Sequence, residues 1–164
     1  MSLIVADASP LIAIAGSGLI PVLRALADEV IVPETVRAEC IRDLSLRGAQ
    51  AIRDAVEAGD LQVRPDVTPG DDPNGELSGL DAGELAAINL ALLLRCRVLM
   101  DERLGRQAAR RRGLVVIGSS GFLIDAKRRG LIPAVAPILD QWLQSGYFLS
   151  GALVKAVLSR AGEA

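Results

Sequence analysis

The stretch SLIVADASPLIAIAG, residues 2–16, decides the fold. Its first part, LIVA at 3–6, is a short continuous apolar run, typical of a strand buried on both faces of a parallel sheet. A second apolar segment follows at once, with Ser9 as the predicted helix N-cap and Pro10 at the first helical position. The carboxylate of Asp7 stands where strand and helix meet. A charged group between two buried segments suggests a special role.

Short apolar strands alternate with helical segments along the rest of the chain. At 164 residues the chain is expected to form one α/β domain, 1–164. Alternation at this spacing predicts βαβ units and a parallel sheet covered by helices on both sides. A segment rich in Pro, Gly, Asn and Asp, about 66–80, is predicted to be a loop or mobile flap. Further strands are predicted at 29–33, 61–65, 97–100 and 114–118, and helices at 33–45, 48–59, 81–95, 102–113, 119–130, about 134–145 and about 149–161.

The net charge of −2 argues against a uniformly basic nucleic-acid-binding protein, because phosphate binding depends on clustered Lys and Arg. A local basic patch stays compatible with it. The apolar N-terminus lacks the basic region of a secretory signal, and no apolar run reaches the ~20 residues that span a bilayer. A cytoplasmic protein without membrane association is expected.

The chain contains no histidine. Ser-His-Asp and Cys-His catalysis, histidine bases and histidine metal ligands are therefore excluded. Cys40 and Cys96 form no C-x-x-C pair, so neither a disulfide framework nor a zinc cage is expected. An enzyme of this composition depends on carboxylates, hydroxyls, Lys and Arg.

Two acids follow predicted strands. Ligands of parallel sheets bind beyond the carboxyl ends of the strands. Asp7 follows the strand at 3–6 and Asp101 follows the strand at 97–100, so both lie at the edge where a site is expected. The alternative for each is to cap the helix that follows it.

Two more acids lie on predicted helices. Glu84 is in register with the apolar face that includes Ile88, although Asp81 and Glu84 also have the spacing of a capping box. Glu39 follows Val36 by three residues, at the margin of the apolar stripe, and a solvated glutamate is the alternative. Ligation by carboxylate oxygens alone suits Mg²⁺ or Mn²⁺ rather than zinc.

Basic and small polar residues follow the strand ends as well. Arg103, Arg106 and Arg110 share one face of a predicted helix, and such clusters position phosphates without reading sequence. A solvated helix face is the alternative. GSSG at 118–121 is a weak signal for a phosphate cradle through Ser119 or Ser120. The few aromatic rings all lie in the C-terminal third, so no base-stacking platform is evident.

These residues resemble the PIN domains, a family of metal-dependent ribonucleases that includes the VapC-type toxins of toxin–antitoxin pairs. The resemblance implies a three-layer α/β/α fold with a short parallel sheet flanked by helices. It also implies Mg²⁺- or Mn²⁺-dependent hydrolysis of RNA phosphodiester bonds. The segments that carry it are VADASPLI, VPETVRAEC, LDAGELAAINLA, VLMDERLGRQAARRRGL, VIGSSGFLIDAKRRGLI and the terminal LSRAGE, which resembles the ending of one PIN-like subgroup.

The resemblance assigns roles to individual residues. Asp7, Glu39, Glu84 and Asp101 match the four catalytic, metal-binding acids, and Glu102 matches a frequent extra acid beside the fourth. Many PIN toxins have Asp where this chain has Glu84, whose longer side chain leaves the exact metal geometry open. The residues expected at the substrate are Ser9, Arg103, Arg106 and Ser119.

The resemblance further implies a toxin that a cognate antitoxin binds and inhibits, and homodimers are common in the family. A non-catalytic PIN-like module that binds nucleic acid or a partner protein is the main alternative. A phosphohydrolase or receiver-like protein with Asp7 as nucleophile fits less well, because Ser9 stands where the phosphatases have a second Asp.

Overall fold

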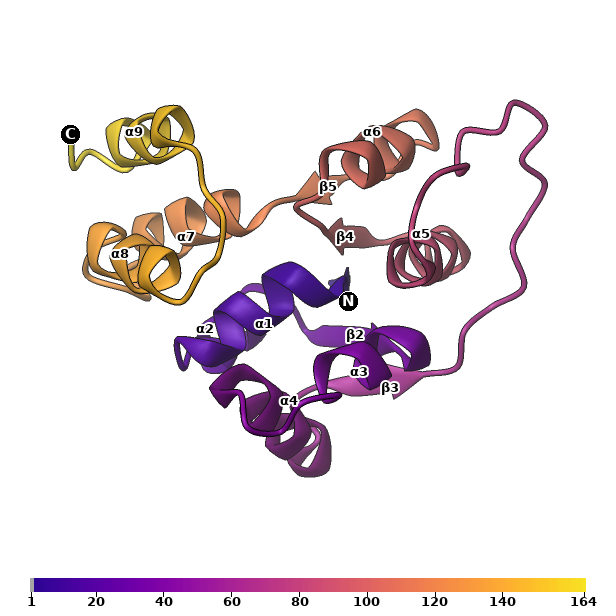
Figure 1. Cartoon of the computed structure of the whole chain (residues 1–164), viewed down its shortest axis with the longest axis horizontal. Coiled ribbons are helices and arrows are strands. Elements are labelled where there is room, and N and C mark those ends of the chain that lie inside the picture. Colours follow the sequence, from indigo (N-terminus) through magenta and orange to yellow (C-terminus); the bar gives the residue numbers. More distant parts are fainter. Residues whose placement is uncertain (1) are drawn as a thin grey trace.

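The computed structural model describes residues 2–164 and contains a five-stranded, all-parallel sheet with helices on both faces (Figure 1). The predicted domain, 1–164, begins at Met1, which lies outside the described residues. The predicted α/β/α class is confirmed. In spatial order the strands are β3 (Gln62–Arg64), β2 (Glu29–Pro33), β1 (Leu3–Ala6), β4 (Arg97–Leu99) and β5 (Val116–Ile117).

The predicted helices are present with shifted ends, and one further helix was not predicted. That helix, α2 (Ile20–Leu26), has only seven residues and begins with Pro21 in its first turn. The first helix begins at Ala8, so Asp7 and not Ser9 occupies its N-cap position. The helix predicted at 33–45 ends at Cys40, and Leu44 beyond it is exposed. The other helices are α1 (Ala8–Gly16), α3 (Glu34–Cys40), α4 (Arg47–Ala58), α5 (Ala82–Leu94), α6 (Arg103–Arg111), α7 (Ser119–Arg128), α8 (Ala136–Gln144) and α9 (Gly151–Arg160).

The central strands are buried on both faces, as their continuous apolar sequences predict. Successive strand residues point to opposite sides of a sheet. Ile4 and Ala6 accordingly pack in one apolar cluster with α1, α2 and α7, while Val5 packs in a second cluster with α5 and α6. The sheet is therefore a rigid base that holds its carboxyl edge in place.

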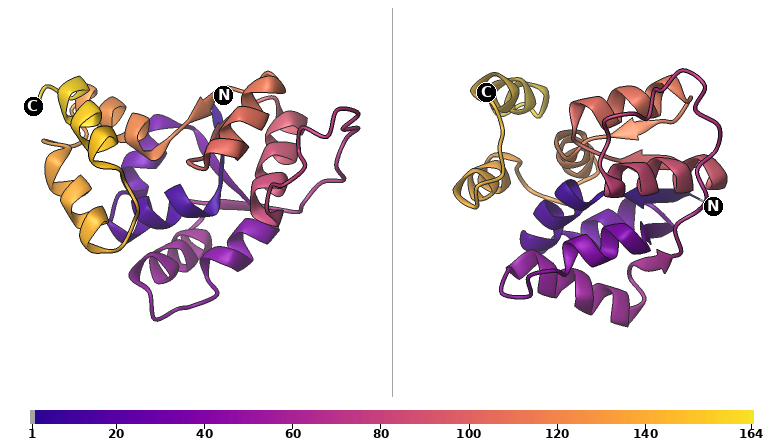
Figure 2. Two further views of the ribbon diagram at one scale, coloured as in Figure 1. Left: turned by 45° about the horizontal axis from the view of Figure 1, so that its top comes forward. Right: turned by 45° about the vertical axis from the view of Figure 1, so that its right-hand side comes forward.

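The segment predicted as a loop, about 66–80, has neither helix nor strand. Its middle part is fastened to α6 nonetheless. The Asp72 carboxylate accepts the backbone N–H groups of Glu76 and Leu77 and pairs with Arg112 at 2.9 Å, and Leu77 itself is buried. Figure 2 shows this loop at one end of the molecule and α8 and α9 at the other.

No single helix within residues 2–164 is long and apolar enough to cross a membrane. α1 and α2 reach that length and composition only as a pair, and the pair is bent by 120°.

Candidate functional site

The carboxyl ends of β1 and β4 lie side by side at one edge of the sheet. The backbone N–H of Asp7 donates to the carbonyl of Leu99 over 2.9 Å, which joins the two strand ends. Asp7 is only 5% exposed, and its side chain makes no capping hydrogen bond to α1. The capping alternative for Asp7 is therefore not what the structure shows.

Three carboxylates converge on Gly83, in the first turn of α5. A Cβ atom built on Gly83 would lie 2.6 Å from Oε2 of Glu39 and 3.5 Å from an oxygen of both Asp7 and Asp81. These acids come from the end of β1, from α3 and from the start of α5. Glu84 lies directly beside them on α5, and we call Asp7, Glu39, Asp81 and Glu84 the acid cluster.

Burial, together with neighbouring charges, raises the pKa values of Asp7, Glu39 and Glu84. Burial raises the pKa of Asp7 from 3.8 to about 7; the Ala8 N–H opposes this rise, and the charges of Asp81, Glu84 and Glu39 add to it. Burial also raises the pKa of Glu84 and of Glu39, and the charge of Asp81 contributes in both cases. Because like charges held this close repel, a cation bound among them would stabilise the cluster.

Asp81 and Glu84 also form the capping box that their spacing predicts. The Asp81 carboxylate accepts the N–H of Glu84 at 2.8 Å, and Oε2 of Glu84 accepts the N–H of Asp81 at 3.1 Å. The box engages Oε2 of Glu84 and fixes its side chain at 6% exposure. Asp81 and Glu84 thus cap α5 and belong to the acid cluster at the same time.

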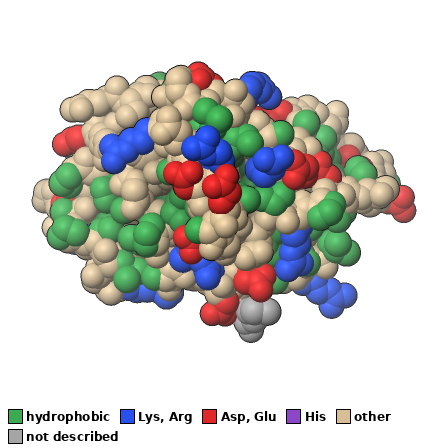
Figure 3. All heavy atoms as spheres, turned by 90° about the horizontal axis from the view of Figure 1, so that it is seen from below, with side chains coloured by type: hydrophobic (Ala, Val, Ile, Leu, Met, Phe, Trp, Pro, Cys, Tyr) green, Lys and Arg blue, Asp and Glu red, His purple; other side chains and the backbone are tan. Residues whose placement is uncertain are grey.

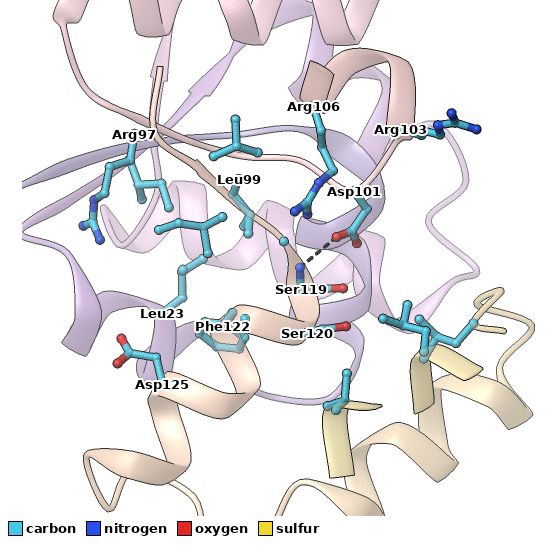
Figure 4. A pocket seen from close by; sticks show the side chains of 18 of the residues that line it. Leu23, Arg97, Leu99, Asp101, Arg103, Arg106, Ser119, Ser120, Phe122 and Asp125 are labelled. Atoms are coloured by element: carbon cyan, nitrogen blue, oxygen red, sulfur yellow. Dashed lines mark hydrogen bonds between the residues drawn. The ribbon is translucent and has the colours of Figure 1, made fainter. Parts of the chain in front are cut away.

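Asp101 faces a different set of groups. Its Oδ1 accepts the N–H of Ser119, the first residue of α7, at 2.8 Å, and its Oδ2 accepts the hydroxyl of Tyr147. Burial raises the pKa of Asp101, the Ser119 N–H lowers it, and so does the charge of Arg106. Figure 4 shows Arg106 and Ser119 close to the Asp101 carboxylate. The N-cap of α6 is Glu102, so Asp101 does not cap that helix.

The predicted site residues therefore fall into two groups. Asp7, Glu39 and Glu84 lie in the acid cluster, and exposed Glu102 is near enough for its charge to raise the pKa of Glu84. Asp101 lies with Ser119 and Arg106, and Ser9 is exposed on α1.

A cavity of about 740 Å³ opens beside Asp101, between β4, β5, α6, α7 and the chain from Tyr147 to Arg160. Arg103, Arg106 and Ser119 line it, and Ser9 does not. In Figure 4 Arg106 points toward Asp101, whereas Arg103 points outward. Tyr147 and Phe148 also line the cavity, and sequence reasoning missed them because only the fold brings the C-terminal segment to this edge.

The surface charge is mixed elsewhere. The face in Figure 3 carries acidic and basic side chains next to one another, which agrees with the small net charge.

The donor chemistry of the acid cluster fits a hard divalent cation, since it consists only of carboxylate oxygens. No group of three Asp, Glu or Cys side chains within residues 2–164 is arranged tightly enough to hold a metal ion as it stands. To bind a metal ion, Asp101 would have to give up its hydrogen bonds from Ser119 and Tyr147.

Comparison with known proteins agrees with this architecture. A family model described as a PIN domain matches residues 3–163. Among solved structures, a PilT N-terminus domain protein from the hyperthermophilic archaeon Sulfolobus solfataricus P2 is similar with a TM-score of 0.52 and 16% sequence identity, over 76% of this chain and 92% of that one. At that identity the likeness is one of fold. No curated protein matches the chain.

Proposed function

The chain belongs to the PIN domain family, a family of nucleases, and on that premise we propose that it is a Mg²⁺- or Mn²⁺-dependent endoribonuclease. The observation that carries the proposal is the acid cluster at the carboxyl edge of the sheet, where the carboxylates of Asp7, Glu39 and Asp81 converge on Gly83 and burial raises the pKa values of Asp7, Glu39 and Glu84. Hydrolysis of a phosphodiester needs a stabilised negative charge and an activated water, and these acids are suited to bind the ion that supplies both.

In this proposal the residues have separate tasks. Asp7, Glu39 and Glu84 hold the divalent ion, with Glu102 and a reoriented Asp101 as further acids. An ion held there would supply the means to lower the pKa of a water and to neutralise charge on the phosphate. The guanidinium of Arg106 positions the RNA backbone beside it, because a planar guanidinium pairs well with phosphate oxygens. Ser119, predicted at the substrate, is only 1% exposed and instead holds Asp101 through its N–H.

Replacement of Asp7 tests the nuclease. In Asp7→Asn the buried site loses a charged ligand, so cleavage of labelled RNA in Mn²⁺ should fall at least ~100-fold, the scale of losing one electrostatic contribution to catalysis. The fold should persist, since the change also removes repulsion within the acid cluster. Asp54→Asn, an exposed acid on α4, is the matched control and should cleave like the wild type. Equal cleavage by wild type and Asp7→Asn, or cleavage unchanged by EDTA, would refute the proposal.

We further propose that the nuclease is the toxin of a toxin–antitoxin pair and acts in the cytoplasm, where a cognate antitoxin inhibits it and a homodimer is the working assembly. The support is the resemblance of the acid-bearing segments to VapC-type toxins. Expression of the wild type should arrest growth and that of Asp7→Asn should not. Equal growth of cells that express the two proteins would contradict the toxin proposal.

The second candidate is a PIN-like module that binds nucleic acid or protein without turnover. The engagement of Asp101 by Ser119 and Tyr147 favours it, because these bonds already occupy both carboxylate oxygens of the fourth acid. RNA binding with no cleavage at any Mn²⁺ concentration would identify this module.

A further inference from the structure

We propose that the cavity beside Asp101 holds one unstacked nucleotide of a single-stranded nucleic acid, with its base on Phe148 and its phosphates on the arginines of α6 and α9. The inference rests on the proposed function, since it describes how the substrate of that site is held. It also assigns a binding role to a C-terminal segment in which the sequence shows no such role.

The cavity has the size and the charge for such a ligand. Its volume, about 740 Å³, is within the ~300–1,000 Å³ typical of ligand pockets. Among its lining residues two acids face a larger number of arginines, in a chain whose net charge is −2. The acids are Asp101 and Asp125, and the arginines are Arg97, Arg103, Arg106, Arg110 and Arg160.

Several of these arginines are available for an anion. Arg97 already donates to Ser2 and to the carbonyl of Leu26, at 2.7 and 3.3 Å. Within the described chain, Arg103, Arg110 and Arg160 form no salt bridge. Their positive charges are therefore free to bind phosphate oxygens, the anions that guanidinium groups recognise best.

An exposed aromatic ring stands on the wall of the same cavity. Phe148 is 88% exposed, the highest value among the exposed large apolar residues. Its neighbour Tyr147 is fixed, because its hydroxyl bonds to Asp101 and its ring packs edge-on against Trp142 with centroids 5.6 Å apart. Trp142 is buried and donates to Ser17. The segment that carries Phe148 is thus anchored. Stacking against a planar ligand group would remove the exposed apolar ring from water, which is favourable.

A nucleotide is the ligand that combines these two requirements, phosphates for the guanidinium groups and a π-face for the ring. In a duplex the bases are already stacked on one another, so Phe148 has no free base face to contact. A single strand exposes its bases and therefore fits the cavity.

The test measures binding separately from cleavage. A fluorescein-labelled oligoribonucleotide and an abasic strand of equal length are titrated in EDTA, with fluorescence anisotropy as the readout. Phe148→Ala should weaken binding of the normal strand about fivefold or more, since stacking contributes ~1–3 kcal/mol per base, and Phe148→Trp should preserve it. On the abasic strand, wild type and Phe148→Ala should bind alike. Leu93→Ala, an apolar site on α5 that is 64% exposed and lies outside the cavity, is the control.

Each outcome is decisive. If the wild type binds no strand, if Phe148→Ala binds like the wild type, or if its loss is the same on the abasic strand, the stacking site is overturned. Cleavage in Mn²⁺ that depends on Asp7 would then still support the nuclease. Conversely, binding that depends on Phe148 without any cleavage supports the nucleotide site and refutes the nuclease. Thermal melting of Phe148→Ala should match the wild type, because the ring is almost fully exposed.

Discussion

At the scale of single residues, Gly83 decides how closely the acids approach. Its missing side chain leaves the space into which Glu39 points, and a Cβ atom there would meet Oε2 of Glu39 at 2.6 Å. The carboxylates of Asp7 and Asp81 border the same space. The glycine thus makes room for the carboxylates of the acid cluster. It does not stabilise the helix, since Gly has a lower helix propensity than Ala.

Gly83→Ala should therefore reduce activity while it preserves the fold. The new methyl group displaces the flexible end of Glu39, so we expect at least a tenfold rise in the Mn²⁺ concentration that gives half-maximal RNA cleavage. Helix propensity gains ~0.5–1 kcal/mol, which should offset the local crowding in thermal melts. Gly151→Ala, where a Cβ atom would meet nothing within 4 Å, is the control. An unchanged Mn²⁺ dependence in Gly83→Ala would contradict a role of Glu39 in metal binding.

Asp7 should make the metal-free protein less stable as the pH rises. Its pKa in the folded state, about 7, lies above its ordinary value of 3.8, so between these values the folded state binds more protons than the unfolded state. The free energy of unfolding then falls as pH increases through this window. In EDTA, the melting temperature of the wild type should decrease by several degrees relative to Asp7→Asn between pH 4 and 8. A difference between the two proteins that does not change with pH would refute this.

At the scale of elements, Glu163 fastens the C-terminal helices to the rest of the molecule. Its carboxylate accepts the N–H groups of Val135 and Ala136, the N-cap and first residue of α8, at 2.8 and 3.0 Å. It also pairs with Lys127 of α7 at 2.9 Å. The terminal LSRAGE thus has a structural explanation. It ends α9 and returns an acid to the start of α8.

Glu163 should affect stability with the opposite pH dependence to Asp7. Hydrogen bonds from Ala136, Val135 and Lys127 lower its pKa from 4.5 to about 2, so its contribution is present above pH 4.5 and is lost as pH falls toward 2. Glu163→Gln should lower the melting temperature by a few degrees at pH 7 and leave it unchanged near pH 2. Glu57→Gln, an exposed acid on α4, should have no effect at either pH. A deficit of Glu163→Gln that persists at pH 2 would refute the role of its charge.

The strands and helices were largely predictable from the sequence. A strand buried on both faces is a continuous apolar run, and a helix has capping residues, Pro or Gly at its ends. α2 was not predicted because Gly16 and Gly18 were interpreted as the end of the only helix in this stretch. Ser9 was assigned to the N-cap by residue type, but the helix begins directly after β1, so Asp7 occupies that position.

At the scale of the whole molecule, the sequence predicted which acids follow strands but not which way their side chains point. Asp7 and Glu39 converge because β1, α3 and α5 pack at one edge. The orientation of Asp101 depends on Tyr147, 46 positions later in the chain, and no local pattern encodes that contact. The sequence showed no evident aromatic platform for a similar reason: Phe148 and the arginines are far apart in the chain, and only folding brings them to the same cavity.

The small net charge and the local arginine cluster predict weak dependence of nucleic-acid binding on salt. Three or four phosphates bound by arginines should give a slope of log K against log salt of about −2 to −3 for a single strand. Anisotropy titrations from low to moderate NaCl measure this slope. A slope several times steeper would show that a wider basic surface binds the strand.

The cavity wall that carries Tyr147, Phe148 and Arg160 belongs to the end of the chain, whereas the acids of the proposed catalytic site lie between Asp7 and Glu102. The residues of this cavity wall, which would determine ligand preference, and the acids, which would determine bond cleavage, thus come from separate stretches of the sequence. Substitutions at Phe148 and in α9 can change which nucleotide is accepted while Asp7, Glu39 and Glu84 keep their positions, so selectivity in such a protein can diverge quickly while its chemistry stays constant.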